Sequence, residues 1–388
     1  MFFKSIKIKN FFFNDNLKSF KRLSISLYKK LINSNNHILL SMMNDYQNSY
    51  SKKLILDLKK YKIVNIIGMG GSSLGSRAIY NFLNSKKKKF NFIDNFSNMN
   101  LKSNKEKKVN IIISKSGNTL ETIANSNINI NQNKNIFLTE NKKSYLTEIA
   151  NKLKAEVVNH NNYIGGRYSV LSEVGMLPAE LMGYKPEKFR RLNKLIKNKK
   201  FVNLLIQNVS NILFLTKKNK TNSIILNYDD RAEDLFKWYQ QLVAESLGKN
   251  NKGLLPVISS MPKDNHSVMQ FYLDGTKNGF YTLFFAKENL SQRIKSANLL
   301  SSYSYIKNKT INDIAFAQFL ATEKVFKRKN IPFRSIVINK RNEETLGELF
   351  TFFILETILL GMAIKVNPYD QPAVELIKIE TKKLLNKN

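Results

Sequence analysis

Residues 62–83, KIVNIIGMGGSSLGSRAIYNFL, contain the features that decide the fold class. The run at 62–68 is apolar on both faces, which is typical of a strand buried inside a parallel sheet. A glycine-rich run follows it directly, and the residues at 72–83 have the spacing of a helix. A buried strand, a glycine loop and a helix in this order predict one half of a strand–helix–strand unit.

The same alternation continues along the chain and predicts an α/β fold with two three-layer α/β/α units, each built on a mainly parallel central sheet. Further strands are predicted at 91–95, 109–116, 135–140, 155–160, 223–228, 254–260, 280–286 and 332–340. Helices are predicted at 202–215, 232–247, 266–274, 312–327, 343–364 and 371–385. A lysine-rich stretch near 185–200 separates the two series. We therefore expect one domain at 50–185 and a larger one formed by 1–49 plus 186–388.

The charge balance is strongly positive, because 63 Lys and Arg face 29 Asp and Glu, a net charge of +34. Only ten of these 63 residues are Arg, whereas a dedicated nucleic-acid reader would use more of Arg's planar, bidentate fork. Lysine runs such as 86–89 lie between apolar segments and are interpreted as solvated faces. No nucleic-acid partner is therefore expected.

Composition also narrows the chemistry and the location. The absence of Cys excludes disulfides, thiol catalysis and Cys-ligated metals. The three His residues, His37, His160 and His266, lack metal-ligand spacing, so we expect neither metal nor cofactor. The longest apolar run, 349–364, is interrupted by Glu356 and is shorter than the ~20 residues of a membrane span. We expect a buried helix there, no membrane partner and a cytoplasmic location.

Two loops follow predicted strands at the sheet edge where open α/β sheets bind ligands. The first, 68–75, has glycines that let the backbone approach an anion, but it lacks both the dinucleotide fingerprint and the P-loop lysine. A small phosphate ester is favoured, with a simple tight turn as the alternative. The second, 114–122, carries four hydroxyls. Asn118 and Glu121 have capping-box spacing, but capping alone does not require those hydroxyls.

Four later segments carry candidate acid–base groups. Arg167 follows two glycines and could face a developing negative charge, although a structural Arg in a turn is the alternative. Glu245 ends a helical stretch among apolar neighbours, where a carboxylate could act as a base or simply lie on the surface. His266 lies in a loop before a helix. Near the end, Gln371 is predicted to cap a helix, with Lys378 two turns on and on the same face.

These six segments, in this order and at these spacings, resemble the phosphoglucose isomerase family over residues 62–385. The resemblance implies two sugar-isomerase-type domains, a homodimer with shared active sites, and interconversion of glucose 6-phosphate and fructose 6-phosphate. Glu245 would move a proton between C2 and C1 through a cis-enediol, and Arg167 would stabilise the enediolate. His266, reaching the site from the partner subunit, and Lys378 would assist ring opening. The residues implied in holding the sugar phosphate are Ser72, Ser114, Lys115, Ser116, Thr119, Thr122, Gly166 and Gln371.

Two departures from the family pattern leave open which sugar phosphates are substrates. The second loop has SKSGNT where many members have SKTFTT, a form nearer to relatives that also isomerise mannose 6-phosphate. Asn265 also precedes His266 where Gln is usual. A dual glucose and mannose 6-phosphate isomerase is therefore one alternative. A non-catalytic sugar-phosphate sensor is another alternative. It is disfavoured by the presence of all four acid–base candidates, Glu245, His266, Arg167 and Lys378.

Overall fold

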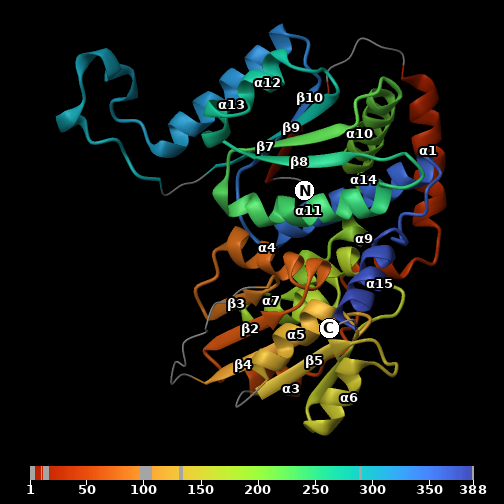
Figure 1. The fold of residues 1–388 in the computed structure, drawn as a ribbon. Helices are drawn as coiled ribbons and strands as arrows, with labels where there is room; N and C mark the ends of the chain where they lie inside the picture. Colours follow the sequence, from red (N-terminus) through yellow and green to blue (C-terminus); the bar gives the residue numbers. More distant parts are fainter. Residues whose placement is uncertain are drawn as a thin grey trace.

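The computed structural model describes residues 5–9, 11, 17–96, 107–130, 134–287 and 291–386. These residues form two five-stranded sheets with helices packed on both faces of each sheet (Figure 1). All neighbouring strands are parallel except one edge pair. The predicted α/β class with mainly parallel sheets is confirmed.

The first sheet has the strand order β3-β2-β4-β5-β6. Its strands are β2 (Ile63–Ile67), β3 (Lys89–Ile93), β4 (Lys108–Ile113), β5 (Lys134–Thr139) and β6 (Glu156–Asn159). Its helices are α3 (Lys52–Leu58), α4 (Leu74–Leu83), α5 (Leu120–Asn129), α6 (Tyr145–Lys152) and α7 (Glu173–Leu181). Because β3 and β4 lie on opposite sides of β2, the chain reverses direction there. The loops after β2 and β4 therefore flank the point where ligands bind in such sheets.

The second sheet has the order β1-β10-β9-β7-β8. Its strands are β1 (Ile6–Lys9), β7 (Asn222–Asn227), β8 (Leu255–Ser260), β9 (Gly279–Ala286) and β10 (Phe333–Ile338). The helices on its two faces are α10 (Lys199–Lys217), α11 (Glu233–Leu247) and α14 (Glu343–Ala363) on one, and α12 (Met269–Asp274) and α13 (Ile311–Arg328) on the other. Strand β1 was not predicted. It pairs antiparallel with β10 at the sheet edge.

The remaining elements are short or peripheral. They are the helices α1 (Lys18–Ile32), α2 (His37–Ser41), α8 (Pro186–Phe189), α9 (Leu192–Leu195) and α15 (Val374–Leu385), and the 3₁₀ turns η1 (Gly70–Ser72), η2 (Gly166–Leu171), η3 (Asp230–Ala232), η4 (Lys263–His266), η5 (Ser296–Asn298) and η6 (Ser301–Ile306). Helix α1 packs against α10 and α14, whereas α3 packs against α7 of the first sheet. Figure 1 shows α15 as a separate helix along one side of the molecule.

One hydrophobic core is shared by both sheets. It contains the inward face of the first sheet with α4 and α7, and the inward face of the second sheet with α10, α11 and α14. Helix α11 joins the two halves, because it packs against α4 as well as β8 and α14 (Figure 1). Separate, smaller cores fill the outward faces, under α5 and α6 in the first sheet and under α12 and α13 in the second.

Helix α14 is the buried helix predicted from the long apolar run. Among the described residues it alone is long and apolar enough to cross a membrane by length and composition. Its most apolar window is 89% buried inside the protein, as is usual for the core helix of a compact fold. Glu356, which interrupts the run, forms a buried ion pair with Arg334 of β10.

A ladder of four asparagine side chains crosses the first sheet. Asn91 of β3 donates to Asn65 of β2 at 2.9 Å, Asn65 donates to Asn110 of β4 at 2.8 Å, and Asn110 donates to Asn135 of β5 at 2.9 Å. These residues occupy one register across the four strands. A slip of one residue would turn the amides to the opposite, apolar face, so the ladder helps to fix the register.

We predict that Asn110→Leu lowers the free energy of unfolding by about 2–4 kcal/mol, because it leaves the buried amides of Asn65 and Asn135 without their partners. Urea unfolding followed by circular dichroism measures the loss. Asn91→Leu, at the half-buried end of the ladder, is the matched control and breaks one bond only. An Asn110→Leu loss no larger than that of the control would contradict a structural role for the ladder.

Candidate active site

The loops after β2 and β4 begin side by side. A Cβ atom added to Gly68 would lie 2.7 Å from the Ile113 carbonyl oxygen, so the backbones approach closely. The first loop forms η1, where Ser72 is half-buried. In the second loop the hydroxyls of Ser114 and Thr119 lie 2.9 Å apart. Hydroxyls of both loops are thus gathered at one edge of the sheet.

The predicted phosphate-binding residues differ in their exposure. Ser116 is exposed and Thr119 is half-buried, whereas Ser114 and Thr122 are buried. The Thr122 hydroxyl has no hydrogen-bond partner among the described residues. Lys115 retains about a third of its side-chain exposure, at 32%. The loop therefore offers both accessible and buried hydroxyls beside one ammonium group.

The capping-box prediction for Asn118 and Glu121 is wrong. Thr119 is the residue before α5, and its side chain makes no capping bond. The Asn118 side chain instead accepts the backbone N–H of Tyr145, at the start of α6, at 2.9 Å. The loop can approach α6 in this way because residue 117 is glycine. Its φ is +69°, and a Cβ there would lie 2.1 Å from the Ser144 hydroxyl.

A small charged cluster lies behind the second loop. Glu140 pairs with Lys115 at 3.4 Å and also with Lys142. His160 lies close to this cluster and is 1% exposed. Burial, with a smaller contribution from the Lys115 charge, lowers the pKa of His160 to about 4. His160 is therefore a neutral structural residue at neutral pH.

Turn η1 packs directly against turn η2, which contains Arg167. A Cβ added to Gly71 would lie 2.2 Å from the carbonyl carbon and oxygen of Gly166 and 2.6 Å from the Arg167 nitrogen. Only glycine fits this contact. The glycine loop after β2 therefore sets the position of the GGRYS segment as well as its own backbone path.

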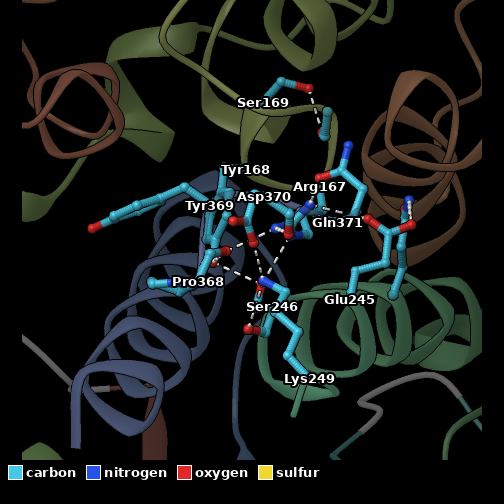
Figure 2. A network of polar contacts seen from close by, with 12 residues as sticks. Arg167, Tyr168, Ser169, Glu245, Ser246, Lys249, Pro368, Tyr369, Asp370 and Gln371 are labelled. Carbon is cyan, nitrogen blue, oxygen red and sulfur yellow. Dashed lines mark hydrogen bonds and ion pairs between the residues drawn. The ribbon is translucent and has the colours of Figure 1, made fainter. Parts of the chain in front are cut away.

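Arg167 is the centre of a polar network that joins three distant segments (Figure 2). Its Nε donates to Ser246 at 2.8 Å, and its two terminal nitrogens donate to Glu245, Gln371 and the carbonyls of Pro368 and Asp370 at 2.7–3.2 Å. The side chain is 1% exposed. All five N–H donors of the guanidinium are therefore accounted for by the protein.

Tyr168 reinforces the same assembly. Its hydroxyl lies 2.7 Å from the Ser246 hydroxyl and donates to the Pro368 carbonyl at 2.9 Å. Burial raises the pKa of Tyr168 to about 12, so this donor stays protonated. The indole N–H of Trp238 donates to the Arg167 carbonyl at 3.2 Å. Helix α11 thus holds η2 at two points along its length.

Glu245 lies beside Arg167 at the mouth of a cleft. Its Oε2 is 3.2 Å from Arg167 Nη1, and its Oε1 accepts from Gln241, one turn earlier in α11, at 3.0 Å. The side chain is 31% exposed. A cleft of about 680 Å³ is lined by Glu245, Gln371 and the start of α15. The carboxylate is therefore oriented by two side chains and open to a ligand.

Lys249, which the sequence interpretation did not single out as a site residue, holds the 367–371 turn in place. Its ammonium pairs with the Asp370 carboxylate at 2.8 Å and donates to the carbonyls of Ser246 and Asn367. This contact keeps the pKa of the Asp370 carboxyl below its usual value. Lys249 lies just beyond the end of α11, four residues after Glu245, so this end of the helix positions both the carboxylate and the turn that carries Gln371.

The prediction that Gln371 caps the last helix and shares a face with Lys378 is wrong. Helix α15 begins at Val374, so Gln371 lies in the turn before it and points to Arg167. Lys378 lies on the exposed helix, with a 62% exposed side chain, and pairs with Glu375 at 2.6 Å. It lies one turn beyond Val374, which lines the cleft.

His266 is not part of the Arg167 network within the described residues. It lies in η4, after the carboxyl end of β8, and is exposed. The preceding Asp264 carboxylate shapes this turn by accepting from Ser259 and from the Ser260 backbone N–H, both at 2.8 Å. The structure therefore brings together Arg167, Glu245, Gly166 and Gln371, but places His266 and Lys378 outside this group.

Comparison with known structures gives the class of fold. A hypothetical protein from Thermus thermophilus has a TM-score of 0.82 at 22% identity, over 95% of this chain and 96% of that one. A glucose-6-phosphate isomerase from Chlamydia trachomatis has a TM-score of 0.76 at 17% identity, over 98% and 88% of the two chains. The fold is therefore that of the sugar isomerases.

Sequence comparison gives the family. Residues 53–261 match the profile described as phosphoglucose isomerase. The chain is 32% identical over 346 residues to the glucose-6-phosphate isomerase of Methanocaldococcus jannaschii, which covers 82% of this chain and 84% of that protein. The chain belongs to the phosphoglucose isomerase family, as the resemblance of the six segments indicated.

We predict that Lys249 and Asp370 are energetically coupled, because their ion pair fastens the 367–371 turn to the segment that follows α11. Lys249→Met and Asp370→Asn should each destabilise the protein, and the double variant should lose roughly 1 kcal/mol less than the sum of the two. Thermal unfolding of the four proteins measures this difference. Strict additivity would mean that the pair contributes nothing to the turn.

We also predict an acid-sensitive contribution from His160. Its pKa is near 4 in the folded protein and about 6.5 when unfolded, so the unfolded chain binds the proton more readily between these values. The contribution of neutral His160 to the free energy of unfolding is therefore fully present above pH 6.5. It falls by up to roughly 3 kcal/mol as the pH drops toward 4. Urea unfolding of wild type and His160→Gln at pH 7.5 and 5 tests this, and an equal acid loss in both would contradict it.

Proposed function

We propose that this protein interconverts glucose 6-phosphate and fructose 6-phosphate. The observation that carries the proposal is the pairing of Glu245 with Arg167 at the mouth of an open cleft, in a chain of the phosphoglucose isomerase family. An aldose–ketose isomerisation requires one base for a proton next to the carbonyl and one group that stabilises the resulting enediolate. The names of the curated relatives support this substrate pair.

In this proposal Glu245 removes the proton from C2 of the open-chain aldose and returns it to C1 through a cis-enediol. The hydrogen bond from Gln241 keeps the carboxylate facing the cleft. Arg167 stabilises the negative charge of the enediolate through its own positive charge, because the protein already accepts hydrogen bonds from its N–H groups. The rigid position of its guanidinium, which the end of α11 and the 367–371 turn hold before substrate arrives, supports this role because little reorganisation is then needed.

The two loops of the first sheet hold the phosphate in this proposal. Ser72 comes from the first loop, and the second loop supplies Lys115 and its hydroxyls, Ser114, Ser116, Thr119 and Thr122. The close approach of the loops at the topological switch point supports a single anion site there. Gly166 and Gln371 complete the pocket on the side of the sugar. No cofactor is required by this chemistry.

We propose that the protein is a homodimer and that each of its two active sites contains residues from both subunits. The exposed position of His266, away from Glu245, supports the idea that it serves the site of the partner subunit. Lys378 would join it for ring opening from α15, whose first residues line the cleft.

We further propose domains at 50–185 and at 1–49 plus 186–388, and a cytoplasmic location. The separate sheets within these ranges support the domain boundaries.

A second candidate function, isomerisation of mannose 6-phosphate as well, is supported by Gly117. Many family members have Phe at this position of the loop. Here the backbone has a φ of +69° and lies so close to Ser144 that a side chain does not fit. The phosphate loop therefore lacks an aromatic group that others carry. Turnover of mannose 6-phosphate, measured beside that of fructose 6-phosphate, decides between strict and dual specificity.

We predict that Glu245→Gln lowers kcat by about 10²–10⁴-fold, because the amide cannot accept the C2 proton. Binding of fructose 6-phosphate, measured by calorimetry, should survive. Glu233→Gln, an exposed substitution at the start of the same helix, is the matched control and should leave the rate unchanged. Full activity of the Glu245→Gln variant would refute both the base and the proposed proton transfer.

We predict that inactive variants complement each other if His266 acts across subunits. A mixture of Glu245→Gln and His266→Ala proteins, unfolded and refolded together, should regain roughly one quarter of wild-type activity, because each mixed dimer has one intact site. Each variant refolded alone is the control. Activity that stays at the level of the parents, while native mass spectrometry detects mixed dimers, would place both residues in the same subunit's site.

A further inference from the structure

A second hollow lies at the opposite edge of the first sheet from the candidate active site. It has a volume of about 650 Å³ and is lined by residues from three segments, 55–62, 87–88 and 180–185. Lys62 precedes β2 and Lys88 precedes β3, so the hollow lies at the amino ends of these strands. The loop at Gly68 begins at the other end of β2, about 20 Å away at ~3.3 Å per residue.

The lining of this hollow is strongly basic. It includes Lys59, Lys62, Lys87, Lys88 and Lys185 but only one carboxylate, Glu180. Among the described residues, no carboxylate forms an ion pair with any of these five lysines. In the active-site cleft, by contrast, Lys249 pairs with Asp370. The positive charge of the hollow is therefore not neutralised by the protein itself.

One lysine of the hollow is held by hydrogen bonds to backbone carbonyls, and a second lies against a glycine. The Lys88 ammonium donates to the carbonyls of Lys59 at 2.7 Å and of Leu58 at 3.4 Å, and also to that of Tyr61, at the end of α3. Lys87 lies across Gly183, where an added Cβ would be 2.5 Å from its Nζ. Partial burial, with the nearby charge of Lys59, lowers the pKa of Lys88. An anion between these groups would relieve this repulsion.

We propose that this hollow binds a small molecule through a triphosphate chain. Compact ammonium groups are well suited to phosphate oxygens, and lysines from three segments surround the space on several sides. Within the described residues the ammonium groups of four of them, all but Lys88, donate to no backbone carbonyl, and a triphosphate carries a comparable number of negative charges. The volume is that of a pocket for one small ligand. A nucleic-acid helix would instead need an extended surface.

The test is calorimetric titration of the full-length protein with sodium tripolyphosphate at physiological ionic strength. Lys62→Ala/Lys87→Ala should weaken binding by roughly ten-fold or more, because two ammonium contacts are lost. Lys152→Ala, an exposed lysine at the end of α6, is the matched control and should bind as wild type. Lys88 is left unchanged because it holds the end of α3. Fructose 6-phosphate turnover without triphosphate should be the same in all three proteins.

Further arms identify the ligand and the place of binding. If ATP and tripolyphosphate bind with the same affinity, the phosphate chain alone is recognised. If ATP binds more tightly, the protein also contacts its base or sugar. Either result supports the proposal. Binding that Lys115→Ala abolishes would overturn it, because the ligand would then occupy the proposed phosphate loop. Equal weakening in Lys152→Ala, no binding of tripolyphosphate, or binding of a DNA duplex alone would overturn it as well.

Discussion

The structure depends on a buried cation. Arg167 is enclosed by segments 78 to 204 residues away in the sequence, and each of its donors has a protein partner. A buried charge that lost these partners would cost several kcal/mol. The end of α11, the 367–371 turn and η2 must therefore come together in one arrangement. The position of the candidate base, Glu245, follows from this requirement.

This constraint explains why three unrelated stretches of sequence act as one assembly. Gly71 permits the backbone contact with Gly166 that packs η2 against the first loop. Ser246 and Lys249, on either side of a helix end, hold the arginine and the turn that faces it. The 367–371 turn contributes carbonyl oxygens as much as side chains. The cleft is thus formed by the end of α11, the residues that follow it and the 371–374 turn, while η2 contributes the arginine that holds these parts together.

Most of the fold could be predicted from sequence because its strands and core helices are long, buried runs. Strand β1 has only four residues, IKIK, and lies at a sheet edge where lysines alternate with isoleucines, so its pattern is weak. Helix α15 begins later than expected because Gln371 precedes Pro372, a position that disfavours helical backbone, and because Gln371 is committed to Arg167. The carbonyl partners of Arg167 have no side-chain signature. The sequence predicts that lysines 86–89 are solvated. Their spacing does not reveal that two of them, Lys87 and Lys88, line the same hollow as lysines from other segments.

The shared core has a consequence for synthesis of the protein. The inward surface of α4 and α7 is covered by α11 and α14, and α14 begins only at residue 343. A nascent chain that has completed the first sheet still exposes this apolar surface while some 160 further residues, 182–342, are translated. Such intermediates are prone to aggregate and are the natural clients of chaperones. The first half of the chain therefore reaches its final packing only when the second half arrives.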